Sequence, residues 1–356
     1  MVASTFLVLV GSFSTYISTL KFSTSPPSLK LVTQTASGEA PSWLTQSPYD
    51  PAIIYATDEV PDGHLNSLVL NRRSGKLVKV DSISTNGIHP THIGAVLDGN
   101  TLGVANYHGS SLFTASLKPD HLHFIPPGHM TFYNGSGPAP QQVDGSHPHQ
   151  VLKNGNEAVV MDLGTDKIWR MVQNRTGDWV VRDHIDQKPG SGPRHGVIVD
   201  STLYTLCELS NNLTQHTFPP LGLGKPKLVA SQSIRPLDTT PDAPLAAAEL
   251  LYADGPSALL YASNRNDPHP QGDAITIFET RPKLQAVKYV RTGLNYIRGM
   301  NFVGPRKEYI IAAGMNGGGI KVFQVVSPAR GYLSEVAHLP NGTIAQPSSF
   351  VWTQWL

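Results

Sequence analysis

The sequence of 356 residues is poor in cysteine and in charge, and these shortages exclude several classes of protein. A single cysteine, Cys207, leaves no intramolecular disulfide and no cysteine metal cluster. Charged residues make up 15% of the chain, the formal net charge is +1, and no run of Lys and Arg is longer than a pair. We therefore expect no surface for nucleic acid or for an anionic membrane.

Several catalytic and metal-binding motifs are missing as well. The chain has no Gly-x-Ser-x-Gly elbow, no Walker phosphate loop and no dinucleotide glycine fingerprint, which disfavours serine-esterase and nucleotide chemistry. There are 14 histidines but no His-Glu-x-x-His pair, and the His147-x-His149 spacing alone is a weak metal signal. We therefore expect neither a metal ion nor an organic cofactor.

Glycine and proline, in contrast, are plentiful at 32 and 29 residues, which suits many tight turns and disfavours long helices. Seven times, at intervals of about 45–56 residues, an apolar β-rich run ends in a tetrad of small or acidic residues, which is the spacing of propeller blades. These tetrads are Gly11–Ser14, Ala56–Glu59, Ala105–His108, Met161–Gly164, Leu206–Leu209, Ala262–Arg265 and Ala312–Met315. The sequence therefore predicts an all-β fold, a single seven-bladed β-propeller domain over residues 1–356.

Strand and turn signals predict how the ring closes. In the second repeat we expect an inner strand beginning at Pro41–Leu44 and three further strands over Ile53–Thr57, Ser67–Leu70 and Leu77–Val80. The C-terminal segment Pro347–Trp352 echoes Pro41–Leu44, so we interpret it as a first strand without the rest of its blade. The N-terminus supplies the three missing strands, namely Phe6–Gly11, Tyr16–Phe22 and Leu29–Val32. Pairing the two ends completes the seventh blade and protects the sheet edges.

Three segments and one set of motifs need separate interpretation. Phe6–Val10 is similar to the apolar core of a secretory signal, but no Lys or Arg precedes it, so we expect an ordinary first strand. Leu117–Asp144 and Phe218–Leu245 break the repeat, and we interpret both as long rim loops.

Four glycosylation triplets favour secretion only weakly, at Asn134, Asn174, Asn212 and Asn341. We expect a soluble, cytoplasmic protein, with secretion as the less favoured alternative.

Polar residues recur at equivalent positions of successive repeats. Just before the second strand come four polar segments, His89–His92, His147–Gln150, Gly192–His195 and Asn295–Arg298. At the second-strand ends come further polar groups, Asp58–Glu59, Asn106–His108, Asp162, Glu208 and Asn264–Arg265. Because the first strands of a propeller line its channel, these groups should converge. Imidazoles, guanidinium groups and a carboxylate in one cavity supply proton-transfer groups and anion clamps.

Each of these positions also has an ordinary structural interpretation. A role in turns or in contacts between blades is the more common outcome for four of them, His89, His147, Asp58 and Asp162. In contrast, His149, Arg194 and His195 recur at equivalent repeat positions, which favours a direct role. Glu208 shares its repeat with Arg194 and His195 and is included for that reason.

Taken together, these segments resemble the seven-bladed lactonase family, which includes bacterial-type 6-phosphogluconolactonase and the fungal carboxy-cis,cis-muconate cyclase. The matching segments are Leu9–Ser14, His92, Ala105–Tyr107, Ser146–Val151, Met161–Asp166, Gly192–His195, Cys207–Leu209 and Ser263–Arg265. The resemblance spans nearly the whole chain and implies catalysis without metal or organic cofactor. It also maps four residues onto the family's active-site cleft, His149, Arg194, Glu208 and Arg265. The chain departs from the family pattern at Ile297–Met300, which leaves the substrate open.

Three functions are compatible with these residues. The first is a cofactor-independent lactonase acting on a sugar lactone, in which His149 or His195, supported by Glu208, moves protons. Arg194 and Arg265 would bind the anionic group and polarise the carbonyl. Substrate binding is expected from four further residues, His92, Asn106, Asn264 and Arg298.

The second function is a cyclase that lactonises a carboxylated muconate with the same His, Arg and Glu set. The third is a non-catalytic propeller that serves as a binding scaffold. In both enzymatic alternatives the partner is a small anionic lactone or muconate, and we expect no nucleic acid or membrane partner.

Overall fold

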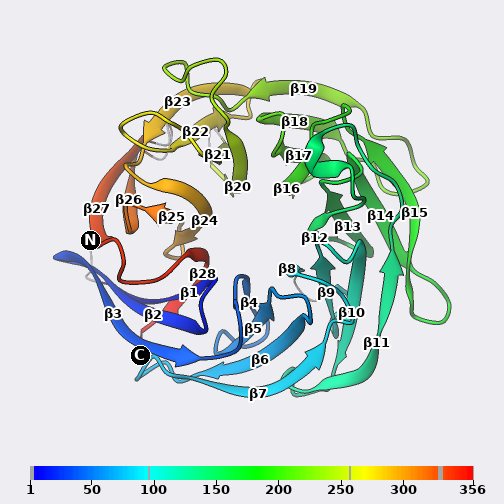
Figure 1. Cartoon of the computed structure of the whole chain (residues 1–356), viewed down its shortest axis with the longest axis horizontal. Coiled ribbons are helices and arrows are strands. Elements are labelled where there is room, and N and C mark those ends of the chain that lie inside the picture. The colour runs from blue at the N-terminus through cyan, green and yellow to red at the C-terminus, as the bar shows by residue number, and fades with distance from the viewer. Residues whose placement is uncertain (1–3, 95–96, 256–257, 328–331, 356) are drawn as a thin grey trace.

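Seven four-stranded antiparallel sheets surround a central axis in the computed structural model, which describes residues 4–94, 97–255, 258–327 and 332–355 (Figure 1). Six of the sheets are built from four consecutive strands, and the remaining sheet combines the two ends of the chain in the order β28-β1-β2-β3. The predicted all-β, seven-bladed propeller is confirmed. Among the described residues, no helix is long and apolar enough to cross a membrane.

Each blade contributes one strand to each of four concentric positions. The innermost strands are β28 (Pro347–Gln354), β4 (Leu44–Gln46), β8 (Pro90–Gly94), β12 (Pro148–Asn154), β16 (Pro193–Val199), β20 (Ala246–Ala253) and β24 (Asn295–Val303). The second strands are β1 (Thr5–Ser12), β5 (Ile53–Asp58), β9 (Thr101–Asn106), β13 (Glu157–Asp162), β17 (Thr202–Cys207), β21 (Leu259–Arg265) and β25 (Tyr309–Gly317). The third strands are β2 (Tyr16–Thr24), β6 (His64–Leu70), β10 (Ser111–Leu117), β14 (Lys167–Gln173), β18 (Asn212–Thr217), β22 (Ala274–Glu279) and β26 (Ile320–Ser327). The outer strands are β3 (Pro27–Ala36), β7 (Leu77–Ser84), β11 (Phe124–Phe132), β15 (Trp179–Asp186), β19 (Leu228–Ser233), β23 (Gln285–Arg291) and β27 (Tyr332–Leu339), and one 3-10 helix, η1, spans Pro140–Gln142.

Burial changes from the second strand to the outer strand of a blade. All residues of β5, β9 and β13 are buried, because adjacent blades cover both faces of these strands. The outer strand β7 buries Leu77 and exposes the next three residues. The apolar side chains pack between neighbouring blades, as where Tyr309 of β25 meets Phe22 of β2 edge-on, with ring centroids 4.9 Å apart. Each fully buried side chain of this kind contributes about 1.5–3 kcal/mol, so blade-to-blade packing holds the ring together.

The ring closes as the sequence predicts. Strand β28 pairs antiparallel with β1, with Val10 opposite Phe350 and Phe6 opposite Gln354. Phe6–Val10 therefore lies inside an ordinary strand, as expected. Phe350 packs in the same apolar cluster as Phe6 and Val10, so the C-terminal strand covers apolar surface as well as a sheet edge.

The two proline-rich segments are only partly loops, which corrects the prediction. Strand β11 lies within Leu117–Asp144 and β19 lies within Phe218–Leu245, and both are the outer strands of their blades. An outer strand has one unpaired edge, so it tolerates the prolines and polar residues that conceal its pattern in the sequence.

The register of the inner strands places their first residues at one end of the ring. Pro90, Pro148 and Pro193 begin β8, β12 and β16 and lie opposite Asn106, Asp162 and Cys207, the last residues of the second strands. In each blade the register shifts immediately after the proline, as at a β-bulge. A bulge re-aims the side chains beside it, and the polar segments of several blades therefore meet at this end.

Candidate active site

A cavity of about 390 Å³, which we call the upper cavity, opens at the end of the ring where the inner strands begin. Residues from all seven blades line it: Phe13, Glu59, His89, Thr91, Tyr107, His108, His149, Glu208, Arg265, Tyr296 and Arg298. Its volume is within the range of small-molecule sites, about 300–1,000 Å³. The structure thus brings together His149, Glu208, Arg265 and Arg298 as the sequence predicts.

Glu208 connects two buried arginines, Arg265 in the lining of this cavity and Arg194 below it. Its Oε2 atom lies 2.9 Å from Nε of Arg194 and 2.7 Å from Nη2 of Arg265. Burial alone would raise the pKa of Glu208, but the guanidinium groups of Arg265, Arg194 and Arg298 outweigh it, and the pKa lies below its ordinary value. Burial and Arg265 lower the pKa of Arg194 to about 10, so this side chain stays protonated at neutral pH.

Arg298 is the most open of the three arginines. It donates a hydrogen bond of 3.1 Å from Nη2 to Oε1 of Glu59, and its guanidinium lies 4.7 Å from the ring centroid of Phe13. Its side chain is 20% exposed, compared with 1% for Arg194 and 3% for Arg265. Arg298 is therefore the cation most accessible to an anion that enters the cavity.

His149 is a buried histidine with a free ring nitrogen. Among the described residues, its Nδ1 atom has no hydrogen-bond partner. Its ring centroid lies 5.1 Å from that of His195 and 5.8 Å from that of Tyr107. Burial, and to a smaller extent the positive charge of Arg194, lowers the pKa of His149 well below its ordinary value. At neutral pH His149 is therefore an uncharged imidazole that can accept a proton.

Glu249 is a functional candidate that the sequence analysis missed. Its carboxylate lies 3.3 Å from Nη1 of Arg194 and 3.1 Å from Nδ1 of His195. The register of β20 shifts between Ala247 and Leu250, and this bulge directs Glu249 toward the channel. In the sequence Glu249 lies within an apolar run and outside the repeated polar tetrads. The available signal was a single carboxylate in an otherwise apolar inner strand.

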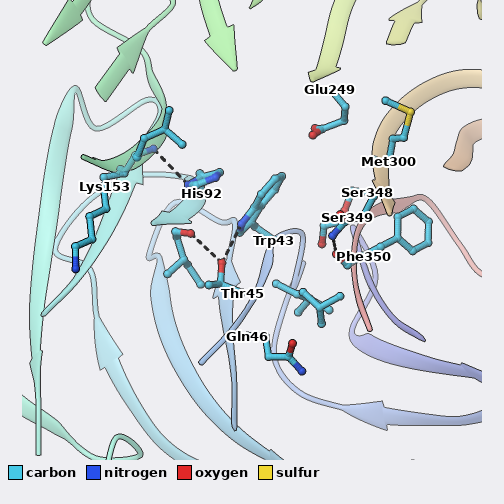
Figure 2. A pocket seen from close by; sticks show the side chains of 17 residues that line it. Trp43, Thr45, Gln46, His92, Lys153, Glu249, Met300, Ser348, Ser349 and Phe350 are labelled. Carbon is cyan, nitrogen blue, oxygen red and sulfur yellow. Dashed lines mark hydrogen bonds between the residues drawn. The ribbon is translucent and has the colours of Figure 1, made fainter. Parts of the chain in front are cut away.

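A second chamber of about 310 Å³ lies beyond the layer formed by Trp43, Arg194 and Glu249. It is lined mostly by apolar groups, including Met300 and Phe350, with Trp43 and His92 on one side and Glu249 on the other (Figure 2). His92 accepts a long hydrogen bond of 3.4 Å from the main-chain N–H of Val151.

Two predicted site residues belong to this layer and not to the upper cavity. The rings of His92 and His195 lie 5.9 Å apart, both packed against Trp43. Neither histidine is among the residues that line the upper cavity, although the sequence predicts substrate binding by His92 and proton transfer by His149 or His195. Arg194 is likewise below the cavity, where it connects Glu208 to Glu249.

Asn106 and Asn264, which were expected to bind substrate, serve the scaffold instead. The Asn106 amide donates to the main-chain oxygen of Thr85 and to the hydroxyl of Ser111. Asn264 accepts the main-chain N–H of Ala274 at 2.7 Å and donates to Asp267. Both side chains are buried, and neither lines the cavity.

The structural interpretation of Asp162 is confirmed. Its carboxylate accepts the main-chain N–H groups of His147 and Gly164, together with the indole N–H of Trp169. His89 does line the cavity, and Tyr296 was missed. Both residues have left-handed backbone conformations, with φ of 54° and 68°, and these are strained for side chains of this size.

A propeller whose central cavity combines guanidinium groups, a neutral imidazole and a paired carboxylate belongs to the class of enzymes that bind small anions and move protons. The family model described as "Lactonase, 7-bladed beta-propeller" matches residues 7–346. The chain belongs to this lactonase family, which confirms the family predicted from its sequence motifs.

Curated relatives cover most of the chain. It is 29% identical over 339 residues to the probable 6-phosphogluconolactonase of Arthroderma benhamiae, which covers 89% of this chain and 82% of that protein. It is 27% identical over 342 residues to the 6-phosphogluconolactonase of Formosa agariphila, with 89% and 92% covered. Among solved structures, the periplasmic gluconolactonase of Pseudomonas aeruginosa superposes with a TM-score of 0.86 at 22% identity, over 99% of this chain and 100% of that one.

Proposed function

We propose that this enzyme hydrolyses an anionic sugar lactone of the 6-phosphogluconolactone type without a cofactor. The observation that carries the proposal is the cavity itself, to which all seven blades contribute and in which Arg265 and Arg298 flank Glu208 and His149. Two curated relatives that cover most of the chain, both named as 6-phosphogluconolactonases, support this substrate class.

In the proposed reaction, His149 accepts a proton from a water molecule as the water oxygen attacks the lactone carbonyl carbon. The carbonyl oxygen gains negative charge, which the guanidinium of Arg265 stabilises. The bond from the carbonyl carbon to the ring oxygen then breaks, and the proton held by His149 passes to that oxygen. Water has been added across the ester bond, and the product is an open-chain hydroxy acid.

Glu208 positions the arginines in this scheme and is not the base. Its carboxylate is paired with Arg194 and Arg265, and its pKa is held low, so it has little tendency to take up a proton. We therefore propose that Glu208 does not transfer a proton itself. It orients the two arginines and contributes to the electrostatic field of the site. His149 lines the cavity and, unlike Glu208, has no ion-pair partner among the described residues, so His149 is the proposed proton acceptor.

Arg298 is proposed as the clamp for the substrate's phosphate or carboxylate, because it combines a positive charge with partial exposure to the cavity. An anion bound there also offsets the positive field that disfavours protonated His149. Substrate binding would therefore make the proton-transfer step easier at His149.

The decisive experiment is a comparison of 6-phosphogluconolactone, unphosphorylated gluconolactone and 3-carboxy-cis,cis-muconate with the same purified protein. We expect the phosphorylated lactone to be hydrolysed well above its spontaneous rate and the unphosphorylated lactone to be hydrolysed more slowly. We expect no cyclisation of the muconate. Turnover of the muconate alone would establish the cyclase reaction instead. Inertness toward all three would favour the binding scaffold.

Location in the cytoplasm stays a prediction. The substrate class fits it, because sugar phosphates are intracellular metabolites. One structural relative is described as periplasmic, so a fusion of the full chain to a fluorescent reporter is the direct measurement.

A further inference from the structure

At the rim of the cavity, two loops bring three potential metal ligands together. His108 follows β9, and Asp144 and His147 precede β12 in the neighbouring blade. One donor atom from each residue lies within 4.8 Å of the other two. His147 is buried, whereas His108 and Asp144 are exposed, and none of the three has a role in the proposed hydrolysis.

The orientation of the His147 ring is fixed by its surroundings. Its Nδ1 atom lies 3.1 Å from the main-chain oxygen of Tyr107, and because a carbonyl oxygen only accepts, Nδ1 carries a proton. The ring stacks on Tyr107 with centroids 4.5 Å apart and planes 9° from parallel. Metal-binding histidines characteristically donate the other ring N–H to such an acceptor, which fixes the tautomer.

With Nδ1 protonated, the Nε2 atom of His147 points at Oδ1 of Asp144 over 2.9 Å. The imidazole of His108 offers a third donor atom within 4.8 Å of both atoms, so one metal ion placed among the three residues could contact all of them. Two imidazoles and one carboxylate match zinc and its neighbours in the first transition series, and they match calcium or magnesium poorly.

We propose that His108, Asp144 and His147 form a binding site for a divalent transition-metal ion of the zinc type. Metal–ligand distances of about 2.0–2.2 Å require the donors to move closer together, and the exposed His108 and Asp144 side chains allow this. Three protein ligands leave a fourth position for water or an anion at the cavity rim. The inference is independent of the proposed lactone hydrolysis.

The test uses full-length, tag-free protein stripped with a chelator and then titrated with cobalt(II) and zinc(II). Cobalt reports directly on coordination through its visible absorption, and competition with a chromophoric chelator gives zinc affinity and stoichiometry. We expect one ion per chain, cobalt bands of tetrahedral intensity, and a melting temperature that rises with zinc concentration because the ion binds the folded state.

Two ligand variants and one matched control make the test specific. His108→Ala and Asp144→Asn change exposed side chains, and each should weaken zinc binding by more than the roughly 10–100-fold that loss of an outer-shell partner costs. The control is His123→Ala, because Asp120 and His123 make a 2.6 Å contact with the same three-residue spacing. Among the described residues, no third ligand joins that pair.

Unchanged zinc affinity in His108→Ala would overturn the proposal, as would loss of binding in the His123→Ala control. Absence of any saturable site in the wild-type protein would also overturn it and would leave Asp144 and His147 as a simple ion pair.

Discussion

Replacing Arg298 by Gln should selectively impair the use of an anionic lactone. Among the described residues, the Arg298 side chain makes one hydrogen bond, to Glu59, and its partly exposed guanidinium keeps further N–H donors for a ligand. A hydrogen bond to a charged group contributes about 1.5–3 kcal/mol, and each 1.4 kcal/mol is a factor of ten in affinity. We therefore expect KM for the phosphorylated lactone to rise by about 10–100-fold, with a much smaller change in kcat.

The variant also leaves the Glu59 carboxylate without its cation, and this charge would repel an anionic substrate. The Ser42 hydroxyl still donates to Glu59, and a double Glu59→Gln, Arg298→Gln variant removes the freed charge. Arg306→Gln is the matched control, because Arg306 is 79% exposed and pairs with Glu308 away from the cavity. Steady-state kinetics with phosphorylated and unphosphorylated gluconolactone measure the effect. Equal losses for the two lactones would refute the anion-clamp role.

Four further outcomes are expected. His149→Asn, with its fold intact by circular dichroism, should lower kcat by roughly 100-fold or more at similar KM, and near-native kcat would remove His149 from the mechanism. Prolonged EDTA treatment should leave kcat unchanged, and a loss restored only by calcium or zinc would contradict a metal-independent reaction. Deleting Pro347–Leu356 uncovers the β1 edge and removes buried Phe350 and Val351, so the product should be insoluble or much less stable, and an unchanged cooperative melting temperature would argue against ring closure. Burial, and to a smaller extent the charges of His195 and Arg194, lowers the pKa of His92 in the folded protein. The unfolded chain therefore binds more protons below about pH 6.5, and the free energy of unfolding should decrease as the pH is lowered through this range. His92→Gln should reduce that slope by up to about 1.4 kcal/mol per pH unit in denaturant titrations, and an unchanged slope would show that His92 does not titrate between the two states.

The propeller and its closure were predictable because they depend on periodicity. The tetrads are spaced by one blade length, and Pro347–Trp352 is similar to Pro41–Leu44. Both patterns can be recognised even where individual strands cannot be assigned from the sequence. The outer strands β11 and β19 were not predictable in the same way. They pack on one face only, so proline and polar residues erase the pattern on which strand prediction relies.

The split between the upper cavity and the layer below it follows from position along the inner strand. Aligning the repeats on their proline makes Thr91, His149 and Arg194 equivalent, and these residues line the upper cavity or its floor. The next residue in each repeat lies beyond the bulge. There His92 lines the second chamber, and His195 packs against His92 and Trp43. The two positions are adjacent in the sequence. Their separation into different environments could not be predicted without knowing that a β-bulge lies between them.

The same rule separates scaffold from site at the ends of the second strands. Asn106, Cys207 and Asn264 lie at or next to the ends of their second strands and are buried inside their blades. The residues that follow them line the cavity, namely Tyr107, Glu208 and Arg265. In each such pair, one residue is buried in the blade and the other lines the cavity. A prediction that assigns both residues to the site therefore overestimates the number of site residues by about a factor of two at these positions.

The proposed anion selectivity of this cavity would not come from net charge. Three arginines are matched by three carboxylates in two separate groups of contacts. Arg194 and Arg265 pair with Glu208 and Glu249 across two adjacent blades, and Arg298 pairs with Glu59 across two others. Removing one member of the buried group of four would leave a buried charge uncompensated, which is strongly destabilising, so Arg194, Arg265, Glu208 and Glu249 are coupled. A guanidinium has five N–H donors. Main-chain oxygens of Ala248 and Ala247 accept further donors of Arg194 and Arg265, whereas the partly exposed Arg298 keeps donors available to a ligand. A substrate anion can therefore be recognised by these remaining donors while the charge network that holds the blades stays intact.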